Sequence, residues 1–207
     1  MKNKNFEKEL PENYRLMLHL NAKDVKLGLI FNLVAVLVSA VIIAIAIFTI
    51  SINDGLGELY HTLYKESSYS LIIYASIFLF GMIFYIVMHE LLHGIFYKLF
   101  TGEKLTFGAS WSCFFCGVPK IYIYRRPAMI AAAAPLVFFT ILLIPLTAWL
   151  YYVNYALYLL SAMILGLHLG GCAGDIYVIL LFLFKFRGNK TLVRDTGPEQ
   201  FFYVGNR

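Results

Sequence analysis

The stretch that decides the fold is residues 70–100, which read SLIIYASIFLFGMIFYIVMHELLHGIFYKLF. A helix needs roughly 20 mainly apolar residues to cross a bilayer, and this stretch exceeds that length. We therefore predict a transmembrane helix that carries His89, Glu90 and His93 within its apolar sequence. An ionised group at the centre of a bilayer costs about 2.5–3.5 kcal/mol, so the cluster indicates a functional site.

Three further apolar stretches have the length of a membrane span, at residues 27–52, 127–153 and 155–184. The last two meet in a tight aromatic turn at Tyr151–Tyr155, which predicts an antiparallel helical hairpin. Charged residues make up only 14% of the chain, against about 25% in soluble domains. The predicted fold is an all-α membrane protein with a four-helix domain at 27–184. It is flanked by an N-terminal segment at 1–26 and a tail at 185–207.

The distribution of charge predicts the orientation of the four helices. Lysine and arginine gather in residues 1–26, 101–126 and 185–207, whereas loop 53–69 is mainly acidic. Basic loops lie on the cytoplasmic side, so we expect a multi-pass protein of the cell (plasma) membrane with both termini in the cytoplasm. The net charge of +5 is thus assigned to anchoring in the lipid bilayer, and no nucleic-acid partner is expected.

The segment between the second and third spans has the composition of a small β-hairpin or sheet at the membrane surface. Residues Leu105–Phe107 and Ile121–Tyr124 are rich in strand-forming residues. Gly117-Val118-Pro119 supplies a turn signal between them.

The motif His89-Glu90-Leu91-Leu92-His93 predicts a zinc site, because histidines four apart lie on one face of a helix. Glu90 lies one position round the helix, where it reaches a metal-bound water rather than the metal. Zinc lowers the pKa of such a water to about 7, which provides a nucleophile at neutral pH. We therefore expect His89 and His93 to be ligands and Glu90 to be the general base.

Catalytic zinc usually takes three protein ligands, and depth in the membrane selects the third. The second and fourth spans are predicted to be parallel, with cytoplasmic ends at Lys98 and Lys185. At 1.5 Å per residue, Asp175 lies about 15 Å from its end, close to the roughly 13 Å of His89. His168 lies about 25 Å in, so Asp175 is the predicted third ligand.

His168 and Cys172 share a helix face with Asp175 in a glycine-rich segment. His168 is a candidate substrate-binding residue, and a buried histidine bonded to a neighbouring helix is the alternative. Cys172 is an alternative ligand, although a small packing residue is the more common role. Cys113 and Cys116 have CxxC spacing, but zinc sites of this type need a second pair, so packing is the preferred interpretation.

The two motifs His89–Gly94 and His168–Asp175 resemble those of a zincin peptidase family of bacterial membrane proteins, and more broadly the site-2 protease clan. The resemblance implies a bacterial origin, a core of three helices, and cleavage of membrane-anchored substrates in or near the bilayer. It also implies that His89, His93 and Asp175 are ligands and Glu90 the base. The chain departs from the clan's aspartate motif, because Ile176 rather than glycine follows Asp175.

These observations predict a zinc-dependent, membrane-embedded endopeptidase that acts on a membrane-anchored protein through a metal-activated water. One alternative is a non-enzymatic metal-binding membrane protein, such as a regulatory subunit or a small transporter. Another is a zinc hydrolase that acts on a lipid-like bond with the same machinery. Metal flux in liposomes would identify a transporter.

Overall fold

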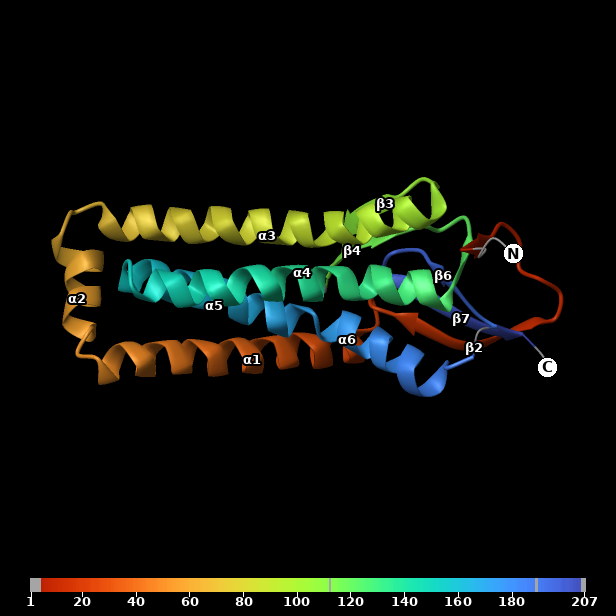
Figure 1. Cartoon of the computed structure of the whole chain (residues 1–207), viewed down its shortest axis with the longest axis horizontal. Coiled ribbons are helices and arrows are strands. Elements are labelled where there is room, and N and C mark those ends of the chain that lie inside the picture. The colour runs from red at the N-terminus through yellow and green to blue at the C-terminus, as the bar shows by residue number, and fades with distance from the viewer. Residues whose placement is uncertain (1–4, 112, 189, 206–207) are drawn as a thin grey trace. The chain divides into compact units, whose positions relative to one another are not determined.

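The computed structural model describes residues 5–111, 113–188 and 190–205, and most of them are helical (Figure 1). Among these described residues, four helical segments are long and apolar enough to cross a membrane. Three are single α-helices, α1 (Val25–Ile52), α3 (Ser70–Thr101) and α4 (Arg125–Tyr151). The fourth segment consists of α5 (Tyr155–Gly171), α6 (Ala173–Leu180) and η2 (Leu181–Lys185). The four predicted apolar helices are present, with each end within two residues of the prediction, and they are compatible with a multi-pass membrane protein.

Polar side chains explain where two of these helices begin. The Asp24 Oδ1 atom accepts hydrogen bonds from the backbone N–H groups of Lys26 and Leu27 at the start of α1. The Asn154 side chain caps α5 in the same way, accepting from the N–H groups of Ala156 and Leu157. Such caps satisfy donors that have no partner within the helix. Two short helices, α2 (Leu56–Tyr60) and η1 (His61–Lys65), occupy the acidic loop.

The chain divides into two compact units. The first contains the residues up to Phe31, Met88–Pro135 and those from Gly174 onward. The second contains Asn32–Val87 and Leu136–Ala173.

Small residues allow α1 and α5 to pack closely within the second unit. A Cβ atom on Gly166 would lie 2.9 Å from the Cα of Ser39, and one on Gly170 would lie 2.6 Å from the carbonyl oxygen of Ala35. Real Cβ atoms essentially never approach backbone atoms so closely, and only glycine fits. Small residues spaced four apart are typical of helix interfaces in membranes.

The adjacent glycines of α5 provide a matched test of this packing. Gly170→Ala is expected to lower the free energy of unfolding by about 1–3 kcal/mol, because the methyl group overpacks the α1 interface. Gly171→Ala is the control, since a Cβ there meets nothing within 4 Å. Thermal unfolding of both variants in detergent measures the difference, and equal melting temperatures would contradict the interface.

A five-stranded antiparallel sheet belongs to the first unit and has the strand order β1-β5-β6-β7-β2. Its strands are β1 (Phe6–Glu7), β2 (Tyr14–Asn21), β5 (Tyr122–Tyr124), β6 (Thr191–Asp195) and β7 (Glu199–Gly205). The N-terminal segment and the tail, which were expected only to flank the membrane domain, thus supply four of the five strands. The fold is mostly helical but not all-α.

The hairpin between α3 and α4 differs from the predicted one in its pairing. Strand β3 (Thr106–Ala109) pairs with β4 (Phe114–Gly117) in a separate two-stranded sheet. Strand β5, the expected partner of Leu105–Phe107, pairs instead with β1 and β6. Gly117–Pro119 therefore separates the two sheets rather than closing a hairpin. The physical reason is that β6 offers a longer apolar partner, with Leu192 and Val193 almost fully buried.

The apolar core of the first unit joins this sheet to the helices. Ile123 of β5, Phe202 of β7 and Phe182 of η2 are at most 1% exposed. The same cluster contains Tyr97 of α3 and Ala131 of α4. The ends of α3 and α4 nearest the motif are therefore packed against the tail of the chain.

Candidate metal centre

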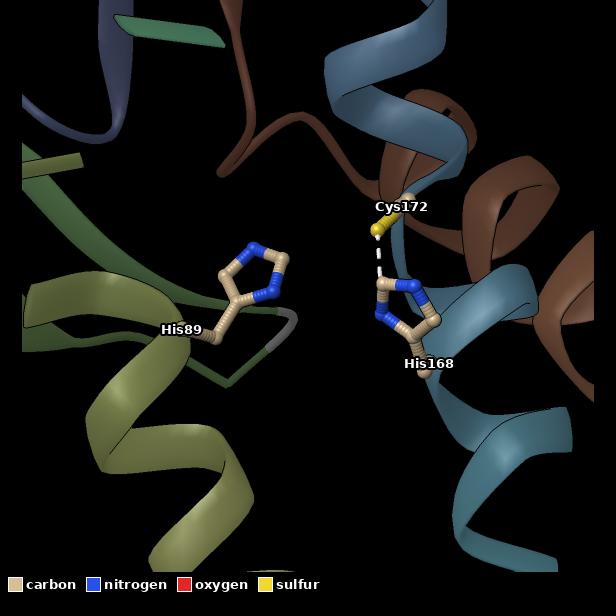
Figure 2. Close-up of side chains that lie close together, drawn as sticks. All are labelled: His89, His168 and Cys172. Carbon is tan, nitrogen blue, oxygen red and sulfur yellow. Dashed lines mark hydrogen bonds between the residues drawn. The ribbon is translucent and has the colours of Figure 1, made fainter. Parts of the chain in front are cut away.

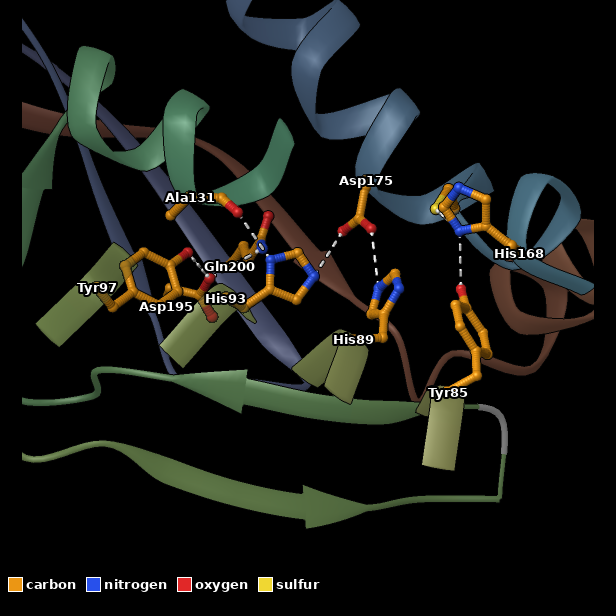
Figure 3. A network of polar contacts seen from close by, with 10 residues as sticks. Tyr85, His89, His93, Tyr97, Ala131, His168, Asp175, Asp195 and Gln200 are labelled. Carbon is orange, nitrogen blue, oxygen red and sulfur yellow. Dashed lines mark hydrogen bonds and ion pairs between the residues drawn. The ribbon is translucent and has the colours of Figure 1, made fainter. Parts of the chain in front are cut away.

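The side chains of His89, His93 and Asp175 lie together within the first unit (Figure 3). Helix α3 supplies His89 and His93, whose rings are 5.0 Å apart between centroids. The fourth span is interrupted at Cys172, so Asp175 lies in the first turn of α6. Its Oδ2 atom is 3.3 Å from Nε2 of His89, and its Oδ1 atom is 3.4 Å from Nε2 of His93.

These separations fit a metal ion better than direct hydrogen bonds. A charge-assisted N–H···O bond usually measures about 2.7–2.9 Å. Two ligand atoms at about 2.0–2.1 Å from a tetrahedral zinc ion are instead roughly 3.3–3.4 Å apart. Glu90 belongs to the same group, because a carboxylate oxygen lies within 4.8 Å of ligand nitrogens on His89 and His93. The donor set of two imidazoles and a carboxylate is one that zinc prefers.

A backbone carbonyl of α4 orients one of the two imidazoles. Nδ1 of His93 donates a hydrogen bond of 2.8 Å to the carbonyl oxygen of Ala131. With Nδ1 occupied by Ala131, Nε2 faces Asp175 and is the ring atom that could bind a metal. Metal-binding histidines are usually held by a second contact of this kind.

A buried carboxylate from the tail lies beside the motif and has no counterpart in the sequence prediction. Asp195 of β6 is 3% exposed and accepts a hydrogen bond of 2.6 Å from the Tyr97 hydroxyl. It also accepts from the N–H of Gly197 at 2.8 Å and from Nε2 of Gln200 at 3.1 Å. Burial is the main cause that raises the pKa of Asp195 to about 6. The sequence holds one signal for this contact. Tyr97 lies four residues after His93, the same interval that separates the two histidines, so all three lie on one face of the helix.

The cysteines of the hairpin have no second pair that would complete a metal site among the described residues. The Cys116 thiol is buried next to Gly94, and a Cβ atom there would lie 3.3 Å from its sulfur. Burial, followed by the negative charges of Asp195 and Glu90, raises the pKa of Cys116 to about 12. The thiol is therefore protonated at neutral pH, and thiolate is the form that binds metals. Cys113 contacts Ser110 at 3.4 Å between Sγ and Oγ.

His168 and Cys172 belong to the second unit and are fully buried there. Nδ1 of His168 is 3.1 Å from the Tyr85 hydroxyl, and Nε2 is 3.0 Å from the Thr140 hydroxyl. Figure 2 shows the Cys172 sulfur facing the His168 ring, 3.6 Å from Nδ1. Both ring nitrogens thus have partners on neighbouring helices, as in the alternative interpretation of His168. Its role in substrate binding stays a prediction.

The raised pKa of Asp195 predicts how the free energy of unfolding depends on pH. Its pKa of about 6 in the folded chain exceeds the roughly 3.9 of an unfolded aspartate, so the folded state binds the proton more tightly. The contribution of Asp195 to the free energy of unfolding is therefore greatest below pH 4 and falls by at most about 3 kcal/mol as the pH rises through 6. The groups that face Asp195 are Tyr97, His93 and Glu90 on α3, Cys116 on β4 and Gln200 on β7.

Replacing Asp195 by asparagine is expected to abolish this part of the pH dependence. Thermal unfolding of the wild-type chain and of Asp195→Asn, compared from pH 4 to 8, isolates the contribution of the single carboxyl group. Parallel curves for the two proteins would show that Asp195 titrates normally.

Residues 82–189, just over half of the chain, match the protein family described as "Putative zincin peptidase", and the chain belongs to this family. No curated protein and no solved structure was found to be similar to the chain. The matched region contains all the predicted site residues, including Glu90 and Asp175, whereas Asp195 lies beyond it. Membership of the family suggests a zinc metallopeptidase.

Proposed function

We propose that this protein is a zinc-dependent, membrane-embedded endopeptidase that cleaves membrane-associated proteins. The observation that carries the proposal is the Asp175 carboxylate, which faces Nε2 of both His89 and His93 at 3.3 and 3.4 Å. These residues lie on helical segments that are apolar enough to cross a membrane. A membrane-embedded site is also what a resemblance to the site-2 protease clan implies.

The roles of the side chains follow from their chemistry. His89, His93 and Asp175 would hold zinc, and Ala131 would keep the His93 ring in the required tautomer. When bound, zinc would supply a Lewis acid and a water of lowered pKa. Glu90 would be the general base, whose carboxylate would take a proton from the attacking water and later give it to the leaving amine. Hydrolysis of the peptide bond then balances, since water supplies the hydroxyl to the acyl group and the proton to the amine.

The substrate is proposed to bind as an extended strand along β3. All four residues of β3 are exposed, and β4 is its one strand partner in the described part of the chain. The hairpin packs against α3 at Gly94, where a Cβ atom would lie 2.8 Å from Phe107. It therefore lies beside the residue that follows His93. An added strand would present its carbonyl groups close to the motif, as in other cases of strand addition.

The hydrogen-bond pattern of the hairpin identifies a residue that tests this binding mode. The Ser110 N–H donates to the Cys113 carbonyl, and the pairs of an antiparallel ladder alternate between bonded and non-bonded. Ala109, in the next pair, thus directs its N–H away from β4. Ala109→Pro removes that donor without breaking the hairpin, and we expect about a tenfold rise in KM with zinc content unchanged. Ala109→Val, which keeps the N–H, is the control, and equal KM values for both variants would contradict strand addition.

The membrane proteome of cells that carry Glu90→Gln tests the function as a whole. Compared with wild-type cells, we expect at least one membrane-anchored protein to accumulate in its uncleaved form. An unchanged proteome, combined with one zinc per purified chain, would instead support the metal-binding, non-enzymatic alternative.

A further inference from the structure

The proposed mechanism leaves one buried charge near the motif unused. Asp195 is almost fully buried, and each of its carboxylate oxygens accepts at least one hydrogen bond. The turn between β6 and β7 shapes this site, since Gly197 has a positive φ of 101° and donates its N–H to the carboxylate. The hairpin formed by β6 and β7 is called the C-terminal hairpin below. It therefore fixes the position of a buried carboxylate, that of Asp195.

This carboxylate is connected to the candidate metal centre in two ways. The first is the hydrogen bond of 2.6 Å from Tyr97, which lies one helical turn after His93 and is itself 5% exposed. The second is electrostatic, because the buried carboxylate of Asp195 lies close enough for its charge to act on the side chains of His93 and Glu90. Figure 3 shows the contacts of Asp195 with Tyr97 and those of His93 with Ala131 and Asp175.

We propose that Asp195 is a positioning residue of the metal centre. Held by the C-terminal hairpin, its carboxylate fixes α3 at His93 through Tyr97 and adds a negative charge that strengthens the binding of a divalent cation. The inference rests on the proposed function only in that the centre binds zinc. It makes the tail, which the family match does not include, a part of the site.

Stability alone does not explain a carboxylate at this position. Burying an ionised group is costly. Tyr97 and Gln200 both donate to Oδ2 of Asp195, so the single oxygen of asparagine could accept from both. Its Nδ2 would then face the N–H of Gly197, and this one hydrogen bond would be lost. The negative charge is therefore the main property that asparagine would not replace.

The experiment measures zinc affinity of the purified full chain in detergent, by competition with a chromophoric chelator. It compares the wild type with Asp195→Asn, which removes the charge, and Tyr97→Phe, which removes only the hydroxyl. Glu199→Gln is the matched control, since it makes the same change on the same hairpin but its carboxylate contacts His19 of β2. Thermal unfolding of the metal-free proteins and the visible spectrum of the cobalt-substituted proteins accompany each measurement.

We expect Asp195→Asn to bind zinc about 10–100-fold more weakly, the range typical of residues that support metal ligands. At pH 7.5 its metal-free form should be at least as stable as the wild type, and its cobalt spectrum should be altered. Tyr97→Phe should show a smaller loss of affinity, and Glu199→Gln none.

Zinc affinity of Asp195→Asn within twofold of the wild type would overturn the inference. So would a loss of affinity matched by a lower melting temperature of the metal-free protein and an unchanged cobalt spectrum. A wild-type chain that binds no zinc would refute the proposed function itself, which separates the two failures.

Discussion

Replacement of Glu90 by glutamine is expected to reduce peptide hydrolysis by about 10²–10⁴-fold while zinc remains bound. The amide has the size of the carboxylate but cannot accept a proton from the metal-bound water. Zinc should remain because the proposed ligands are His89, His93 and Asp175, whose separations are unaffected. The loss should appear in kcat rather than KM, since Glu90 acts on the reacting water and not on the bound strand.

Purified protein, reconstituted in liposomes with a cleavable membrane-anchored substrate, allows both quantities to be measured. Metal content is determined on the same samples. Glu58→Gln, in exposed helix α2, is the control for the same change of charge. Wild-type turnover by a zinc-loaded Glu90→Gln protein would refute the general-base role.

Replacement of Asp175 by asparagine is expected to weaken zinc binding by on the order of 100-fold or more. Residues that only support a ligand already contribute 10–100-fold to affinity, and a direct ligand should contribute at least as much. The variant also loses the negative charge that faces the two imidazoles. Zinc at 100 times its Kd stabilises a folded protein by about 2.7 kcal/mol, and the variant should lose this effect.

The shift of the melting temperature on adding zinc provides a second readout that needs no substrate. Asp54→Asn is a suitable control, because Asp54 has a φ of 55° and asparagine tolerates this left-handed conformation. If Asp175→Asn shows the same zinc-induced shift as the wild type, the third ligand lies elsewhere.

The four helices could be predicted from the sequence because each depends on local composition. An apolar run such as residues 70–100 has no alternative in a bilayer, where every backbone group must be bonded internally. The starts of α1 and α5 could also be predicted from the sequence, since Asp24 and Asn154 are residues that cap helices. The sheet could not be predicted in this way, because β2 pairs with β7 across more than 170 residues of the chain. No local pattern in either strand identifies the strand with which it pairs.

Part of the candidate site could also be predicted from the sequence, because it depends on local helical patterns. The spacing of His89 and His93 is a property of one helix, and the depth of Asp175 follows from the length of another. Both arguments use only helical geometry, and in the structure the Asp175 carboxylate lies 3.3 Å from His89 and 3.4 Å from His93. The carbonyl of Ala131 offers no such signal, because every residue has one.

The sequence by itself determined the apolar helices, the pair of histidines on one face of α3 and the aspartate that faces them. These features depend on helical periodicity and length, which act over a few turns of chain. Only the tertiary structure decided that β5 joins a sheet with the tail, and that Asp195 meets Tyr97 beside His93. The reason is physical: a contact between residues 98 positions apart forms through the burial of a shared core, and no local pattern encodes it.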